Sequence, residues 1–453
     1  MTATLRLLAV LGLAALMAAC SAPVRPDLER LYETDAQNDA QPPIIVIHGL
    51  MGSTLVERSS GKEFWPGSIG SLAFSEYREL VRMRAVEESG GGLVPGDLFY
   101  GVARTDFYAA LTGSLESVGR FKRGTPGEPV DRGDRRRYYV LLYDWRKENL
   151  VAVGQLHAMV EQIRRDYGDP KLRVDILAHS NGGLIANYYL RYGPKDVLTQ
   201  GELTPWDEGP ARIRRMVLLG TPSLGAVTSF ERLQQGFKIA WRTVPVEVLA
   251  TFATVYEALP HPDAPVVYAP DGTLLDFDFF DPETWRSRRW SVFSPELEAR
   301  VLEAAPDPAT GALQMAELQA MFARHLVRAK RFQQAVSAPI RTSGVRIAVF
   351  GGDCLLTPGR AVLDRTESGE RLVIKPEDVQ ARVEGVDYER LLLLPGDSLV
   401  TRESQLGLGL PEVAGADRGV YPTAQSFFLC ETHDQLSVNP YFQNNLLKFL
   451  LSP

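Results

Sequence analysis

The chain has 453 residues, enough for one large α/β domain with insertions or for two domains. Hydrophobic residues make up 45% and charged residues 23%, a balance that excludes both a disordered chain and a polytopic membrane protein. The formal net charge of -7 offers no basic field for nucleic acid, and the three cysteines lie too far apart for a zinc site. We therefore expect no nucleic-acid partner, metal or cofactor.

The first residues have the form of a processing signal. Arg6 precedes an apolar run at 7–17 that is too short to span a bilayer comfortably, and Ala-Ala-Cys-Ser follows at 18–21. This pattern resembles a bacterial lipoprotein signal, with 1–19 removed and Cys20 lipidated at the start of a polar tether, 20–41. Ser21 suggests attachment to the outer membrane, and a plain secretory signal on a secreted or periplasmic protein is the alternative.

After the tether, the first predicted element is a buried strand at 43–47, Pro-Ile-Ile-Val-Ile. The loop that follows, 48–53, contains glycine, and the backbone amides of such a loop can face a nucleophile at the carboxyl end of the sheet. We predict the amide of Met51 as one oxyanion donor, with that of Leu50 as the near alternative.

A less regular region spans 57–101. It contains Trp65, several apolar residues at helical spacing and a flexible Gly-Gly-Gly run at 90–92. A mobile apolar lid over a lipid site and a small packed subdomain both fit this pattern.

Helix and strand patterns then alternate: a helix at 107–118, a strand at 136–143 and a helix at 153–167. This alternation predicts a doubly wound, mostly parallel sheet. Together with the turn at 178–182 and the segment at 230–340 described next, it predicts an α/β-hydrolase fold with an inserted cap and a lid-like segment.

The centre of the chain reads as a buried strand, a sharp turn and a helix over 174–190. The turn, Ala-His-Ser-Asn-Gly at 178–182, matches the nucleophile elbow with its first glycine replaced by Ala178. We predict Ser180 as the nucleophile and the amide of Asn181 as the second oxyanion donor. An ordinary turn with a helix-capping serine is the structural alternative.

A strand is predicted at 215–220. From residue 230 the alternation of side chains that is typical of strands is no longer evident, and we interpret 230–340 as a cap. It separates the first core part, 42–229, from the second, 341–453. The cap has aromatic residues that either line an acyl-chain pocket or form the core of the cap itself. They are Phe277, Phe279, Phe280, Trp285 and Trp290.

The second core part has strand patterns at 344–350, 391–394 and 426–430 and a final amphipathic helix at 439–451. In α/β-hydrolases the order is serine, acid, histidine, so the base follows Ser180. Of His261, His325 and His433, the last directly follows a core strand and is our predicted base. Two aspartates, Asp353 and Asp397, fit the acid.

These motifs, in this order, resemble one family. They are Pro-Ile-Ile-Val-Ile-His-Gly-Leu-Met-Gly at 43–52, Tyr-Asp-Trp-Arg at 143–146, Ala-His-Ser-Asn-Gly-Gly at 178–183, Leu-Gly-Thr-Pro-Ser-Leu-Gly at 219–225, Gly-Asp-Ser-Leu-Val at 396–400 and the terminal His433. The family they resemble is that of lecithin:cholesterol acyltransferase, which includes phospholipid:diacylglycerol acyltransferases and lysosomal phospholipase A2.

The resemblance implies Ser180 as nucleophile, Asp397 as acid and His433 as base, with Met51 and Asn181 as oxyanion donors. It also implies a disulfide between Cys354 and Cys430, and a lid near Trp65. The residues expected to border the substrate pocket or lid are Leu50, Trp65, Trp145 and Trp285. One departure is that no cysteine lies between Cys20 and Cys354, so the early lid disulfide of the family is absent.

The function expected from these features is serine-dependent acyl transfer from a glycerolipid ester, a phospholipid or an acylglycerol, to an alcohol or to water. The expected partners are the lipid substrate and a membrane surface reached through the lipid anchor. An esterase for soluble short esters and a non-catalytic envelope-binding protein are the competing hypotheses.

Overall fold

The structure is a computed structural model that describes residues 25–38, 41–67, 75, 77–82, 92–102, 105–199, 201–239, 242–338, 344–367, 369–410, 420 and 422–452. The expected signal and Cys20 lie outside these residues. Among the described helices, none is long and apolar enough to cross a membrane.

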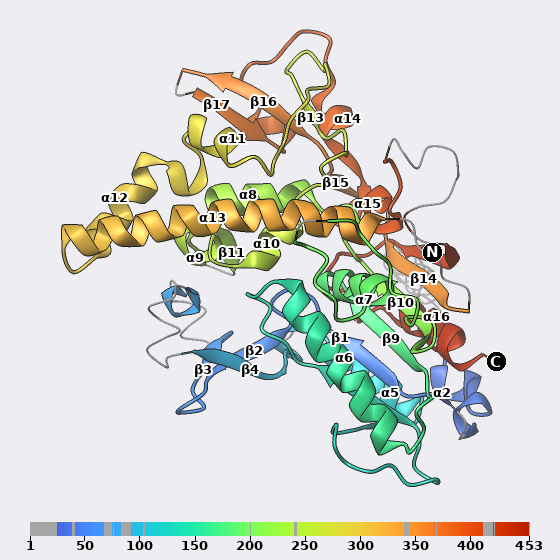
Figure 1. Ribbon diagram of the computed structural model, residues 1–453. Coiled ribbons are helices and arrows are strands. Elements are labelled where there is room, and N and C mark those ends of the chain that lie inside the picture. Colours follow the sequence, from blue (N-terminus) through green and yellow to red (C-terminus); the bar gives the residue numbers. More distant parts are fainter. Residues whose placement is uncertain are drawn as a thin grey trace, which may run out of the picture.

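A sheet of seven strands forms the centre of the molecule, in the order β19-β14-β10-β9-β1-β8-β7 (Figure 1). Its strands are β1 (Ile44–Ile47), β7 (Lys122–Arg123), β8 (Arg137–Leu141), β9 (Val174–His179), β10 (Ile213–Leu219), β14 (Arg346–Gly352) and β19 (Thr423–Leu429). All neighbouring strands run parallel. The predicted parallel sheet is therefore confirmed.

Helices cover both faces of this sheet (Figure 1). They are α6 (Asn149–Asp166) and α7 (Asn181–Tyr192) on one face, and α5 (Ala109–Ser117) and α16 (Pro440–Leu451) on the other. Successive residues of β1 point to opposite faces, so Ile45 and Ile47 join the core with α6 and α7, whereas Ile44 and Val46 join the core with α5 and α16. This double covering explains why β1 is a continuous apolar run.

A small antiparallel sheet follows β1, in the order β3-β2-β4. Its strands are β2 (Ser53–Glu57), β3 (Glu63–Trp65) and β4 (Leu93–Leu98), and η2 (Arg78–Leu80) and the hairpin β5 (Gly101–Val102) and β6 (Thr105–Asp106) belong to the same region. Trp65, Tyr77 and Leu80 are buried. The described part of the expected lid-like segment is thus a packed subdomain. Before β1, the chain forms α2 (Leu28–Leu31) and η1 (Asp35–Gln37).

The cap lies beside the carboxyl ends of the central strands, and its long helix α13 runs across it (Figure 1). Its elements are α8 (Val227–Gln235), β11 (Phe237–Ile239), β12 (Arg242–Val244), α9 (Val246–Leu249), α10 (Ala253–Glu257), α11 (Pro282–Ser287), η3 (Ser291–Phe293), α12 (Pro295–Ala304) and α13 (Pro308–Ser337). Helix α8 ends at Gln235 because Gly236, with a φ of 85°, ends it and opens the hairpin of β11 and β12.

A second small sheet joins the cap to the late part of the chain. Its strands are β13 (Val267–Tyr268), β16 (Ala361–Thr366) and β17 (Gly369–Val373), followed by η4 (Pro376–Asp378), α14 (Tyr388–Leu392) and α15 (Arg402–Leu406). The cap strand β13 pairs with β16, which the sequence analysis assigned to the second core part. The late chain therefore contributes to the cap as well as to the core.

Strand β18 (Leu393–Gly396) pairs antiparallel with β15 (Leu355–Pro358) and so returns the chain from this sheet to the end of β14. Beside it, Cys354 and Cys430 form a disulfide, with their Cα atoms 5.0 Å apart. The pairing implied by the resemblance is confirmed, and it connects the chain just after β14 to the chain just after β19.

Candidate active site

Ser180 stands in a strained turn between β9 and α7. Its φ of 52° and ψ of -122° lie where residues other than glycine are disfavoured, which is the conformation of a nucleophile elbow. The turn also requires glycine at 182, because a Cβ there would lie 2.5 Å from the carbonyl oxygen of Ile47. The local sequence therefore holds the Ser180 hydroxyl at the carboxyl end of the sheet.

His433 and Asp397 complete a chain of hydrogen bonds from this hydroxyl. Nε2 of His433 lies 2.9 Å from Oγ of Ser180, and Nδ1 lies 2.7 Å from Oδ2 of Asp397. The Asp397 side chain is fully buried, and its Oδ1 accepts the backbone amides of Leu399 and Val400. The structure thus brings together the three groups expected at this site.

The other candidates from the sequence lie elsewhere. Asp353 sits 3.8 Å from Arg402 and is partly exposed. Nε2 of His261 lies 2.8 Å from Oγ of Ser337, which resembles a second serine–histidine pair. However, Nδ1 of His261 accepts the amide of Asp263, so Nε2 carries the proton and is not a base. His325 packs against Tyr256 in the cap.

Met51 and Asn181, whose amides are the predicted oxyanion donors, line the cavity that contains Ser180, and no acceptor for either amide occurs among the described residues. The same holds for Leu50, the near alternative. Asn181 opens α7, where the first amides of a helix have no partner within it. Met51 has a φ of 61°, in the loop that follows β1. Such amides are suited to stabilise an oxyanion beside Ser180.

A series of hydrogen bonds connects the loop after β1, residues 48–53, which we call the predicted oxyanion loop, to the backbone of His433. The hydroxyl of Tyr108 accepts the amide of Gly49 at 2.8 Å and lies 2.8 Å from Nδ1 of His179. Nε2 of His179 lies 3.3 Å from the carbonyl oxygen of His433. Burial, and then the proximity of His433, lower the pKa of His179 to about 3, so this ring is neutral. The His179 ring therefore connects Tyr108, which holds the loop after β1, to the loop after β19 that carries His433.

The Tyr-Asp-Trp-Arg motif at 143–146 forms hydrogen bonds that hold the loop after β1 and the side chain of Asn181 in place. The Tyr143 hydroxyl donates to the carbonyl of His48 and accepts from the side chain of Asn181, and the Trp145 indole donates to the carbonyl of Ser53. Arg146 forms a buried ion pair with Asp144. The same guanidinium donates to the carbonyls of Leu80 and Leu93, which ties the β2–β4 subdomain to the core.

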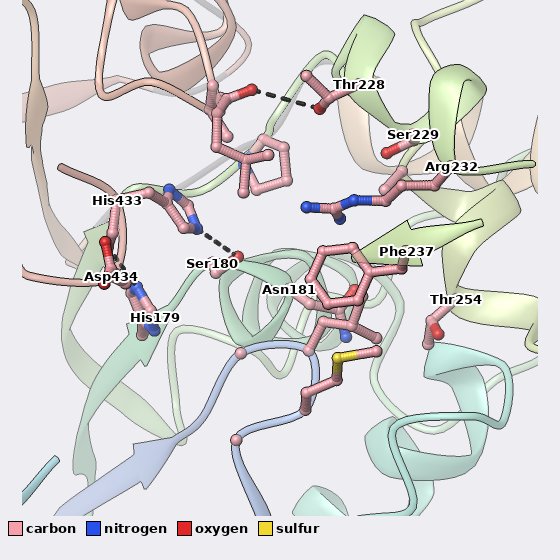
Figure 2. Close-up of a pocket in the computed structure, with 18 of the residues that line it drawn as sticks. His179, Ser180, Asn181, Thr228, Ser229, Arg232, Phe237, Thr254, His433 and Asp434 are labelled. Atoms are coloured by element: carbon pink, nitrogen blue, oxygen red, sulfur yellow. Dashed lines mark hydrogen bonds between the residues drawn. The ribbon is translucent and has the colours of Figure 1, made fainter. Parts of the chain in front are cut away.

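A largely apolar cavity of about 420 Å³ opens over Ser180 (Figure 2). Leu50 and Trp65 line it, as the sequence analysis expected. Trp145 and Trp285 do not: Trp145 packs behind Trp65, and Trp285 is fully buried in the cap against Phe230. The cap aromatics named above, Trp285 among them, form the core of the cap.

Several residues of the site were not predicted from the sequence. Tyr108 had no signal beyond its place near a helix start. Asn149, which exchanges side-chain hydrogen bonds with Asn181, and the buried Glu257, which accepts the amide of Asn149, had none either. Arg232 points into the cavity from α8 (Figure 2). Among the described residues, no group of three His, Cys, Asp or Glu is placed to hold a metal ion.

The sheet, the elbow and the serine–histidine–aspartate chain define an α/β-hydrolase fold with its site at the carboxyl ends of the strands. No protein-family model and no curated protein matches the sequence. Among solved structures, the Tle4–Tli4 complex contains a chain with the same fold, with a TM-score of 0.52 and 15% identity over 91% of this chain and 98% of that one.

Two lipases superpose less closely. Lipase BlEst2 of Bacillus licheniformis in its mature form has a TM-score of 0.33 and 11% identity, covering 92% of this chain and 94% of that one. Lipase 1 from Pelosinus fermentans has a TM-score of 0.34 and 11% identity, covering 91% of this chain and 99% of that one.

Proposed function

We propose that the protein is a serine-dependent acyl-transfer enzyme that acts on glycerolipid esters. The observation that carries the proposal is the bonded chain from Ser180 through His433 to Asp397, opening into a cavity of about 420 Å³ with apolar walls. An apolar cavity with a few convergent polar groups suits the acyl chain of a lipid. The motifs shared with the lecithin:cholesterol acyltransferase family favour the same substrates.

In the first half-reaction, Nε2 of His433 takes the hydroxyl proton of Ser180 as Oγ bonds to the ester carbonyl carbon. The amides of Met51 and Asn181 donate to the resulting oxyanion, each donor lowering the barrier by roughly 3 kcal/mol in related sites. The tetrahedral intermediate then collapses. The carbon–oxygen bond to the glycerol breaks, and the leaving alcohol takes the proton from His433.

In the second half-reaction His433 removes a proton from an incoming hydroxyl, which attacks the acyl-serine. The attacking oxygen keeps the acyl group, and Ser180 regains its proton. Water gives a free fatty acid, and an alcohol gives a new ester. We propose both outcomes for this site, in a ratio set by how well the cavity holds an alcohol in place of water.

Fluorophosphonate labelling with peptide mapping tests the nucleophile, and mass spectrometry of products from labelled phospholipid, with and without an added long-chain alcohol, tests the reaction. We expect Ser180→Ala to lose both labelling and turnover. Ser337→Ala, which changes the serine bonded to His261, is the matched control and should keep both. Full turnover by Ser180→Ala would overturn the proposal, and a rate that does not rise when the substrate forms micelles would favour a soluble ester instead.

We further propose that Cys20 carries the lipid that anchors the enzyme to the bacterial envelope. The apolar run before it and the Ala-Ala-Cys-Ser sequence support this. Expression with labelled palmitate should label the wild type, and Cys20→Ser should lose the label and leave the membrane fraction. Retention of the variant in membranes would contradict a lipid anchor.

A further inference from the structure

An arginine without a counter-ion stands in the wall of the cavity. Arg232 lines the cavity, and its guanidinium lies 4.5 Å from the centre of the Phe237 ring. Within the described parts of the chain its side chain forms no hydrogen bond or ion pair. The neighbouring carboxylate, Glu231, is paired with Lys375 at 2.9 Å.

The surroundings of this guanidinium make the lack of a partner costly. Burial lowers the pKa of Arg232 to about 10, so the group is still charged at neutral pH. The side chain is half-buried, and the nearby Glu231 offsets only part of the effect of burial, so the charge has lost part of the solvation it has in water. An anion that enters the cavity with the substrate would supply the missing partner.

Other groups at this end of the cavity also suit an anion. Ser229 lies one turn before Arg232 on α8 and lines the same wall, and its hydroxyl has no hydrogen bond among the described residues. Lys238 lines the cavity from β11. The one carboxylate that the described lining contributes, Asp434, is exposed and lies beyond His433, across Ser180 from Arg232 (Figure 2).

We propose that Arg232, with Ser229, binds the phosphodiester of a glycerophospholipid while one of its ester carbonyls lies at Ser180. The inference rests on the proposed function, and it selects a phospholipid over a neutral acylglycerol as the acyl donor. In a glycerophospholipid the phosphodiester is the anion nearest the ester carbonyls. The planar fork of arginine binds two phosphate oxygens at once.

The test compares dioleoylphosphatidylcholine with dioleoylglycerol in the same detergent micelles. The two lipids have the same acyl chains and no net charge, so micelle surface charge is matched and the phosphodiester is tested. We expect the wild type to prefer the phospholipid, and Arg232→Met to lower kcat/KM for it by about 10- to 100-fold, the effect of losing hydrogen bonds to a charged group. For dioleoylglycerol and for p-nitrophenyl butyrate we expect less than about a threefold change.

Two further variants sharpen the result. Arg232→Lys keeps the charge without the fork and should lie between the wild type and Arg232→Met. Arg286→Met is the matched control, because Arg286 also stands over a phenylalanine ring of the cap but lies outside the cavity. It should leave the ratio of the two lipid rates unchanged.

The outcomes separate this inference from the proposed function. If fluorophosphonate labels Ser180 but Arg232→Met lowers all three rates equally, or none, the inference fails and the proposed function stands. If inorganic phosphate at millimolar concentration inhibits p-nitrophenyl butyrate hydrolysis as strongly as a non-hydrolysable diether phosphatidylcholine, Arg232 binds free phosphate and the inference is also overturned. If Ser180 is not labelled, the proposed function fails first.

Discussion

Nδ1 of His433 lies 2.7 Å from Oδ2 of Asp397, and this contact sets the state of the imidazole. Because Nδ1 donates its proton to the carboxylate, Nε2 is left unprotonated and faces the hydroxyl of Ser180. Two backbone amides hold the other carboxylate oxygen, so the aspartate cannot turn away.

Asp397→Asn should therefore reduce kcat by about 10³- to 10⁴-fold, because an amide favours the wrong tautomer of His433. Thermal unfolding should show that the variant still folds, and kcat on p-nitrophenyl butyrate measures the loss. Asp353→Asn is the control, since that carboxylate faces Arg402 and should lose little activity. Equal losses of kcat in the two variants would contradict the assignment of Asp397 as the acid.

Tyr108→Phe should lower kcat while leaving the fold intact. The change leaves the amide of Gly49 without its acceptor and His179 without a partner at Nδ1, so the predicted oxyanion loop loses its fixed position. We expect a loss of about 10-fold in kcat with little change in KM, as for an interaction that acts mainly in the transition state. A rise in KM at constant kcat would instead mean that Tyr108 acts on substrate binding.

The meeting of Ser180 and His433 could be predicted because the signals of both residues are local. Ser180 lies in a turn whose residues fix its own geometry, and His433 directly follows the last strand of the sheet. The acid was ambiguous because Asp353 occupies the simple place after β14. Asp397 reaches the same end of the sheet because β18 pairs with the distant strand β15. It lies so close that a Cβ on Gly352 would be 2.7 Å from the Asp397 Cβ.

The walls of the cavity could be predicted only in part: Leu50 and Trp65 line it as expected, whereas Trp145 and Trp285 do not. An aromatic residue such as Trp285 has the same pattern in the core of a cap as in a pocket, and tertiary packing decides between them. Arg232 looks like a solvated charge on an amphipathic helix. Its place in the cavity wall becomes visible only in the structure, where Gly236 ends α8 and the chain turns back to place Phe237 against the guanidinium.

Arg146→Met should destabilise the protein strongly. It leaves the buried Asp144 with only the more distant Lys147, at 4.0 Å, as a cation, and it removes the donors to Leu80 and Leu93. Loss of one partner of a buried pair lowers the free energy of unfolding by about 3–5 kcal/mol, which urea unfolding would measure. The double variant Asp144→Asn/Arg146→Met should lose less than the sum of the two single variants, and strict additivity would argue against a coupled pair.

Buried histidines should make the fold sensitive to acid. His261 is 3% exposed, and burial lowers its pKa from 6.5 to about 4. Between these values the unfolded chain binds a proton that the folded chain does not, so stability falls as pH drops below about 6.5. His261→Gln keeps a donor and an acceptor but does not titrate. Urea unfolding at pH 7 and pH 5 should show that this variant loses about 2 kcal/mol less on acidification than the wild type. An identical pH dependence would contradict the assignment.

The disulfide between Cys354 and Cys430 should matter for both stability and catalysis. It closes a loop with a sequence separation of 76, so replacing both cysteines by serine should lower the free energy of unfolding by about 4 kcal/mol, because the unfolded chain gains freedom. His433 follows Cys430 by three residues, so kcat should also fall under conditions where the variant is folded. Wild-type protein treated with a reductant should come to match the double variant in both measurements. If reduction leaves unfolding and kcat unchanged, the bridge neither supports the sheet edge nor positions the histidine.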